Sequence, residues 1–430
     1  MYPPLYQESQ HVILGIIFFM LLISIFRQKY ALLAYLIIII FRPGDSYPFL
    51  GAIRFEMIVG LYIFALIVVR GKLQIASTEY HKITKAMYLF FFIVFISVAQ
   101  AFDFSHSLDY AYRISFLIFA FYIMFVCSFE KMEDLKLFVF VYILIMSWMA
   151  YMPIYEHFMG IGSVRHGAGI IHSKGLIGFA RGHVALANLM TQSIPFAYFM
   201  FMGEENKVKK LILLGALLIF VMATISSGSR GGFLGLVICA GLFWYKAKKK
   251  GIASVVMVAL IIVALGLNPN YLNWVFTILD FGSSDISAHS RIVGLRHGIE
   301  MAAKRPILGV GIGCYPLARS AWFHWGIWAH NHYGELIGEL GIMGVLSWGW
   351  LIYLCFKEIK KIRDYIGRNS HVDPFYNTLM DACWATLILR LIIGMTTHSL
   401  MSFVWYMIAG ILVVTTKLLE KTYPDFALKE

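Results

Sequence analysis

Apolar runs long enough to cross a bilayer alternate with polar stretches along the whole chain of 430 residues. A membrane-spanning helix needs about 20 mostly apolar residues, and this measure predicts roughly twelve or thirteen spans here. The pattern therefore predicts an all-α, polytopic integral membrane bundle that forms one domain, residues 1–430. The expected spans lie near residues 11–26, 30–41, 53–69, 84–100, 110–128, 135–153, 184–202, 209–226, 231–245, 252–267, 336–356, 376–397 and 400–416.

The composition agrees with this interpretation. Hydrophobic residues make up 60% of the chain and charged residues only 14%, whereas a soluble domain carries about 25% charged residues. No basic residue precedes the first apolar run and no small-residue cleavage site follows it, so we interpret this run as a span rather than a signal peptide. The five cysteines show neither CxxC nor zinc-site spacing, so we expect no disulfide and no structural metal.

Basic residues predict the orientation. Alternate connections and the C-terminal tail together hold 23 of the 36 Lys and Arg residues, and the side with this excess is expected to be the cytoplasm. The longest polar stretch, residues 268–335, then forms a large loop on the outer face. The N-terminus also lies outside if all thirteen spans are real.

The 13 basic residues left for the outer side are mostly arginine. Eleven are Arg and two are Lys, whereas the inner set has four Arg and nineteen Lys. A guanidinium grips phosphate or carboxylate through two parallel hydrogen bonds, which favours an oxyanion ligand on the outer side. The alternative is that these cations pair with nearby carboxylates or lipid phosphates. The outer set is Arg42, Arg54, Arg113, Arg165, Lys174, Arg181, Arg230, Arg291, Arg296, Lys304, Arg305, Arg319 and Arg390.

Two turns at helix starts carry candidate anion-binding groups. Residues 226–232 read Ser-Ser-Gly-Ser-Arg-Gly-Gly and join two apolar runs, so backbone N–H groups at the next helix start could bind an anion beside Arg230. The structural alternative is a tight hairpin with a solvated arginine. Arg181 opens the span near 184–202, where a cation is unfavourable for the helix dipole unless an anion is held there.

The outer loop contains two further segments of interest. Residues 290–304 have apolar positions at helical spacing, which predicts an amphipathic helix on the membrane surface. Residues 309–313 read Gly-Val-Gly-Ile-Gly, but neither strand–turn–helix context nor a following Lys-Ser/Thr supports a phosphate loop.

At the end of the loop, His330-Asn331-His332-Tyr333 leads into the next apolar run. A histidine at this position can accept a proton from a hydroxyl near neutral pH. Metal binding through the two histidines and a structural cap of the next helix are the alternatives, although the spacing matches no standard zinc site.

These motifs together resemble the O-antigen ligase/polymerase superfamily of bacterial envelope polysaccharide enzymes. The resemblance covers about residues 181–344, which we take as the catalytic core. The matching elements are Ser227–Gly232, Ser290-Arg291, the Arg-Pro-Ile-Leu-Gly-Val-Gly-Ile-Gly of 305–313, His330-Asn331-x-Tyr333, and the Glu-Leu-Gly-Ile-Met-Gly of 339–344.

The resemblance implies a C-type, metal-independent glycosyltransferase fold without cofactors, in the bacterial inner (cytoplasmic) membrane, with the active site and the large 268–335 loop at the periplasmic face. It implies an undecaprenyl-diphosphate-linked glycan as donor, a glycan or lipid A-core-type acceptor, contact with membrane lipids and no nucleic acid. Arg181, Arg230 and Arg291 would hold the diphosphate and His330 would be the base. Asn331, His332, Tyr333 and Arg305 would support the site, and His332 leaves the identity of the base open.

Ligase and polymerase versions share these motifs, so the sequence does not separate them. A transporter or flippase of a lipid-linked anionic saccharide is the alternative of another class. Transporters place charged sites near the midplane and often contain repeats, whereas the cations here gather toward the outer side and no repeat is visible.

Overall fold

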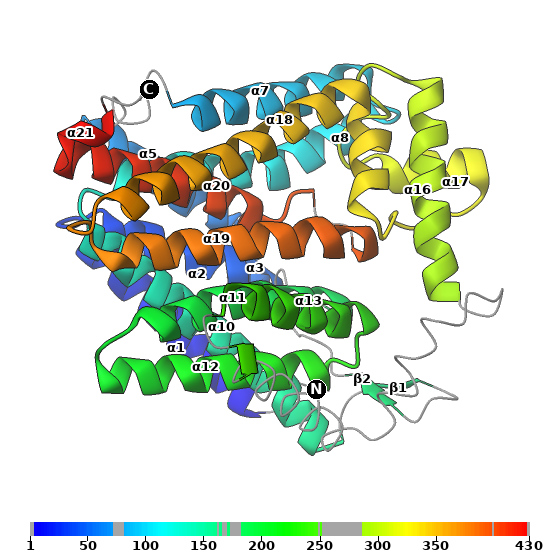
Figure 1. Ribbon diagram of the computed structural model, residues 1–430. Helices are drawn as coiled ribbons and strands as arrows, with labels where there is room; N and C mark the ends of the chain where they lie inside the picture. The colour runs from blue at the N-terminus through cyan, green and yellow to red at the C-terminus, as the bar shows by residue number, and fades with distance from the viewer. Residues whose placement is uncertain are drawn as a thin grey trace.

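A computed structural model describes residues 4–71, 81–160, 163–165, 170–172, 182–247, 250–251, 286–397 and 400–427 (Figure 1). The first half contains α1 (Pro4–Ser24), α2 (Lys29–Phe41), α3 (Pro43–Ser46), α4 (Pro48–Ala52), α5 (Phe55–Val69), α7 (Lys82–Ile96), η1 (Ser97–Gln100), α8 (Phe104–Tyr110), η2 (Ala111–Ser115), α9 (Phe116–Ser128) and α10 (Met132–Phe158). The second half contains α11 (His183–Gly203), α12 (Lys207–Ser226), α13 (Arg230–Lys246), α16 (Ile286–Lys304), α17 (Tyr315–Phe323), α18 (His332–Arg368), α19 (Pro374–Ile393), η4 (Gly394–Thr396), α20 (Phe403–Thr422) and α21 (Pro424–Ala427).

The prediction of a polytopic helical membrane protein is confirmed. Among the described residues, eight helices are long and apolar enough to cross a bilayer, and three shorter apolar helices lie at 11–24, 29–41 and 55–69. The expected span 252–267 lies outside the described residues. One feature departs from an all-α chain: β1 (Ser163–Arg165) and β2 (Ile170–His172) pair antiparallel.

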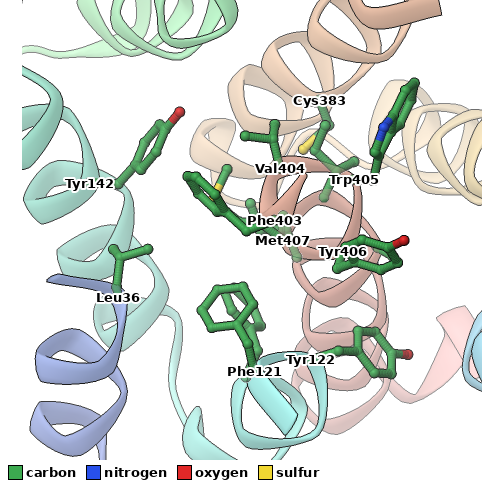
Figure 2. Packing of buried hydrophobic residues seen from close by; sticks show 14 of the residues in the cluster. Leu36, Phe121, Tyr122, Tyr142, Cys383, Phe403, Val404, Trp405, Tyr406 and Met407 are labelled. Carbon is green, nitrogen blue, oxygen red and sulfur yellow. The ribbon is translucent and has the colours of Figure 1, made fainter. Parts of the chain in front are cut away.

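The helix α20 lies at the centre of the bundle. Almost every residue from Phe403 to Leu419 is buried, because α7, α9, α10, α18 and α19 all pack against this helix. Figure 2 shows Leu36, Phe121 and Tyr142 on one side of α20 and Tyr406 pointing away from them. A helix that is apolar on all faces is stable only when other helices or lipid cover every side. Here, other helices cover it.

Ion pairs connect the elements at one end of the bundle. Lys29 contacts Asp134 at 2.6 Å, and Lys136 contacts Asp373 at 2.8 Å. The carboxylate of Asp381 on α19 forms ion pairs with both Lys246 of α13, at 2.9 Å, and Arg363 of α18. These contacts place predicted inner connections next to one another. The sequence-based alternation of inner and outer connections agrees with them.

The helix α18 is broken at Gly341, and the loop before α17 is inserted into the break. Gly341 has φ 59° and ψ −156°, so the backbone there is not helical. Ile342 N and Met343 N donate to the carbonyls of Pro306 and Ile307, at 2.9 and 3.2 Å. In return, Val310 N and Gly311 N donate to the carbonyls of Gly338 and Glu339, both at 2.9 Å. The loop thus satisfies the groups that would otherwise bond i to i+4 across the break.

The glycines of the 309–313 segment have a packing role. Gly309, Gly311 and Gly313 have φ of 65°, 92° and 78°, a region that other residues rarely adopt. A Cβ on Gly311 would overlap the Cβ of Ala101, and one on Gly313 would lie 2.5 Å from the ring of Tyr110. The segment therefore fits tightly between α8 and α18.

The predicted amphipathic helix exists as α16, and Figure 1 shows it running across the ends of the long helices. Its small residues face the protein: a Cβ on Gly294 or Gly298 would overlap the carbonyls of Ala329 and Gly334. The apolar Ile292 and Ile299 are instead 67% and 51% exposed. The protein-facing side of α16 is thus a glycine stripe, which the apolar periodicity did not indicate, and the predicted contact of the isoleucines with a membrane surface stays a prediction.

Candidate functional site

The Gly-rich turn after α12 places Arg230 at the first position of α13. Ser229 caps this helix by accepting a hydrogen bond from Gly232 N at 3.2 Å. The two glycines allow close packing, since a Cβ on Gly232 would lie 2.8 Å from the Cβ of Ala187. Arg230 is only 8% exposed, so the solvated arginine of the structural alternative is wrong.

Arg291 and the start of α13 meet at the short helix η4. Arg291 Nε on α16 donates to the carbonyl of Thr396 at 3.1 Å. A Cβ on Gly231, next to Arg230, would lie 3.1 Å from the hydroxyl oxygen of the same Thr396. Two arginines that are 61 positions apart in the sequence therefore belong to elements that touch one residue.

His330 lies in the segment that connects α17 to α18. It has φ 48°, in the left-handed region, and is partly buried. Arg319, fully buried on α17, holds this segment: its Nη1 donates to the carbonyls of Ile327 at 3.3 Å and Trp328 at 3.0 Å. Arg319 thus fixes the backbone just before His330, and strained residues at functional sites are usually held by such surroundings.

The electrostatic environment of His330 favours the neutral imidazole. Burial lowers the pKa of His330 below its ordinary value, and the nearby charges of Arg291 and Arg319 lower this pKa further. A neutral imidazole can accept a proton, whereas an imidazolium cannot. Arg291 therefore lies close enough to His330 to influence its protonation.

The three residues after His330 have structural roles in this arrangement. Asn331 is the N-cap of α18, and its side-chain oxygen accepts from Tyr333 N at 3.0 Å and Gly334 N at 3.1 Å. The imidazole of His332 is 1% exposed and packs 4.7 Å from the ring of Trp348 and 5.6 Å from that of Trp405. The hydroxyl of Tyr333 donates to the carbonyl of Leu391 at 2.6 Å. Of the two histidines, His330 is the more accessible and lies beside the arginines.

Two of the expected site residues are not placed with the others. Arg305 donates to the carbonyl of Gln100 and lies 6.0 Å from the ring centroid of Phe102, so it joins the outer loop to the start of α8. Arg181 lies outside the described residues. Of the four residues assigned to catalysis and diphosphate binding, the structure therefore connects three: Arg230 and Arg291 lie on elements that meet at Thr396, and the charge of Arg291 acts on His330.

Sequence reasoning assigned no role to three residues that shape this region. Arg319 and Arg390 counted only as outer cations, yet they are 0% and 1% exposed. Thr396, where α13 and α16 meet, was not predicted to belong to the site, because a single threonine near a helix end does not indicate a function in the sequence. The one available indication was that both arginines lie in apolar surroundings, which is costly without a partner.

Some of the expected carboxylate pairs of the outer arginines do exist. Arg113 pairs with Asp109 at 2.6 Å and Arg296 with Glu300 at 2.8 Å, each four residues apart on one helix. These two pairs are solvent-exposed and of little energetic weight. The alternative reading is thus right for Arg113 and Arg296, which leaves fewer outer arginines available for a ligand.

Fold and site together define a multi-pass membrane protein with arginines gathered beside a histidine at one end of a helical bundle. Residues 215–349 match a family model described as O-antigen ligase. This match confirms the resemblance to the O-antigen ligase/polymerase superfamily, and it supports a glycosyltransferase-like role in polysaccharide assembly. The matched range includes Arg230, Arg291 and His330. No curated protein matches the chain.

Proposed function

We propose that this protein is a membrane glycosyltransferase of the bacterial inner membrane that acts at the periplasmic face. It transfers a glycan from an undecaprenyl-diphosphate donor to a hydroxyl of a glycan or lipid A-core-type acceptor, with inversion and without a metal. Arg230 and Arg291 bind the diphosphate, and Arg181 remains a third candidate for this role. His330 is the base.

The proposed reaction is a single displacement. The imidazole of His330 accepts the proton of the acceptor hydroxyl while the oxygen attacks the anomeric carbon of the donor sugar. The bond from that carbon to the diphosphate oxygen breaks, and its electron pair leaves with undecaprenyl diphosphate. Fixed guanidinium groups in a poorly hydrated site stabilise the charge that develops on the leaving group.

One observation carries this proposal: Arg291 touches Thr396, which also borders the first turn of α13, and it influences the protonation of His330. A leaving diphosphate needs concentrated positive charge next to a neutral base, and this arrangement supplies both. A flippase would need the cations but no base. The placement of His330 therefore favours transfer over transport.

The test is transfer of a labelled undecaprenyl-diphosphate oligosaccharide by the purified protein. His330→Ala is expected to lower the rate by about 10²- to 10⁴-fold, which is the usual contribution of a general base. Arg230→Ala is expected to lower it as well. His332→Phe is the matched control, because an aromatic ring of similar size fills the space between Trp348 and Trp405. Normal transfer by both His330→Ala and Arg230→Ala would refute the site, and loss only in His332→Phe would move the base to His332.

Two further measurements define the reaction. A product ladder identifies a polymerase, whereas one transfer per acceptor identifies a ligase. Activity is expected to persist with a chelator present. Activity that a chelator abolishes and Mn²⁺ or Zn²⁺ restores would contradict the metal-independent mechanism.

A further inference from the structure

A buried arginine lies next to the proposed site but has no part in the mechanism above. Arg390 is on α19, one turn before η4, and is 1% exposed. Its Nη1 donates to the side-chain oxygen of Gln192 on α11 and, at 3.1 Å, to the hydroxyl oxygen of Ser402. The guanidinium also lies 4.1 Å from the ring centroid of Trp405.

The charge of Arg390 is poorly compensated. No described carboxylate pairs with it, and its Nε and Nη2 make no hydrogen bond. Burial of a cation is among the most costly events in folding, and contact with an aromatic ring recovers only a small part of the loss. An ionisable side chain within a membrane-spanning segment therefore indicates a functional site. The helices could be joined here by apolar side chains at lower cost.

A second buried polar group lacks partners nearby. Asn188 is 5% exposed, and neither its side-chain oxygen nor its nitrogen makes a hydrogen bond. It precedes Gln192 by one turn of α11, so the two side chains share a helix face. Its neighbours on α11, Ala187 and Thr191, contact the first turns of α13 at Gly232 and Gly235. Asn188 thus lies between the level of Arg230 and the level of Arg390.

We propose that Arg390, Gln192 and Asn188 form an inner oxyanion subsite that takes a phosphoryl group of the lipid-linked diphosphate. This inference rests on the proposed function and extends it, because it adds a second binding position below Arg230 and Arg291. The two unpartnered nitrogens of Arg390 are adjacent donors on one edge of the guanidinium, which suits two phosphoryl oxygens. Asn188 adds a neutral donor. The guanidinium is covered in this structure, so binding at this subsite requires the outer ends of α11, α19 and α20 to separate.

The experiment measures binding of undecaprenyl diphosphate and of inorganic pyrophosphate to the full-length protein in detergent, together with thermal unfolding. Arg390→Met removes an uncompensated charge, so without ligand it is expected to unfold at the same temperature as the native protein or higher. Its affinity for undecaprenyl diphosphate is expected to fall by about 10- to 100-fold, which corresponds to lost hydrogen bonds from a charged donor. Asn188→Leu is expected to weaken binding in the same direction. Arg296→Met, which removes an exposed and paired charge, is the matched control.

The outcomes separate the possible roles of Arg390. Weaker binding of pyrophosphate as well as of the lipid shows that the headgroup alone enters, whereas an effect on the lipid alone shows that the polyprenyl chain is needed. Unchanged affinity in both Arg390→Met and Asn188→Leu would overturn the proposal and leave Arg390 as a brace between α11 and α19. If Arg390→Met does not fold, Asn188→Leu decides, since Asn188 bonds to nothing in the described protein. Failure of the proposed function appears separately, as normal transfer by both His330→Ala and Arg230→Ala.

Discussion

His330 and His332 are two positions apart in the sequence and have different surroundings in the structure. His330 lies in a loop next to two cations, and His332 lies in a cage of tryptophan rings at the start of α18. The sequence identified the pair but could not separate its members, because helix capping by Asn331 turns one side chain into the core and leaves the other outside. The arginines could not be separated from the sequence either. Arg296 is exposed and paired with a carboxylate, whereas Arg319 is fully buried.

The lowered pKa of His330 gives a prediction for the dependence of transfer on pH. The active form is the neutral imidazole, so the rate is expected to fall as the pH decreases through this pKa, below the ordinary range of histidine. The charged groups that lower the pKa are Arg291 of α16 and Arg319 of α17. In Arg291→Gln one of these cations is lost, so the imidazolium becomes easier to form and the acid limb moves to higher pH. A series of initial rates against pH measures the shift, and an acid limb at the same pH in both proteins would show that Arg291 does not act on the base.

Among the elements, the boundaries of the apolar helices were largely predictable and the connections were not. Periodic apolar runs placed the ends of α7, α12 and α19 within four residues, whereas α20 ends six residues beyond the expected span. The insertion of residues 306–311 into the broken helix α18 was not expected, because it depends on backbone groups, which are the same in every residue. The one feature of the sequence that indicates this insertion is the Gly-x-Gly-x-Gly of 309–313, and this pattern also occurs in unrelated loops.

Gly311→Ala tests this insertion. The residue has φ 92° and its Cβ would overlap Ala101, so we expect a loss of about 2–5 kcal/mol in the free energy of unfolding from backbone strain and overpacking. Gly215→Ala is the matched control: Gly215 lies within α12 with open space around it, so alanine is expected to be neutral or stabilising by up to about 1 kcal/mol. Thermal unfolding in detergent measures both, and equal stability of the two variants would contradict the tight fit of the loop.

On the scale of the whole molecule, hydropathy and charge predicted a multi-pass bundle with distinct ends, and the ion pairs at one end agree with this arrangement. The neighbours of each helix were not predictable, since apolar side chains pack against many partners equally well. The meeting of α13, α16 and η4 was not predictable either, because it depends on the backbone carbonyl of Thr396 and on the missing side chain of Gly231. The domain division into a 268–335 loop and a 181–344 catalytic core stays a prediction.

Asp381→Asn tests the connection between α13, α18 and α19. Asp381 is mostly buried and accepts from two cations, so its neutralisation leaves Lys246 and Arg363 facing each other, and we expect a loss of about 1–3 kcal/mol in the free energy of unfolding. Asp109→Asn, which breaks an exposed pair with Arg113, is expected to cost less than about 0.5 kcal/mol. Chemical or thermal unfolding in detergent gives both values. A similar small loss in both variants would show that Asp381 does not join the three helices.

The position of α20 has a consequence for biogenesis. The ribosome completes α7, α9 and α10 well before it reaches Phe403, yet in the finished protein these helices pack around the segment that starts there. Until that segment is inserted into the membrane, the surfaces of these helices that contact α20 in the finished protein lack their packing partner. A stop codon just before Phe403 would therefore leave a set of spans that the cell's quality-control proteases degrade, even though every residue of the transferase site assigned above would already have been translated.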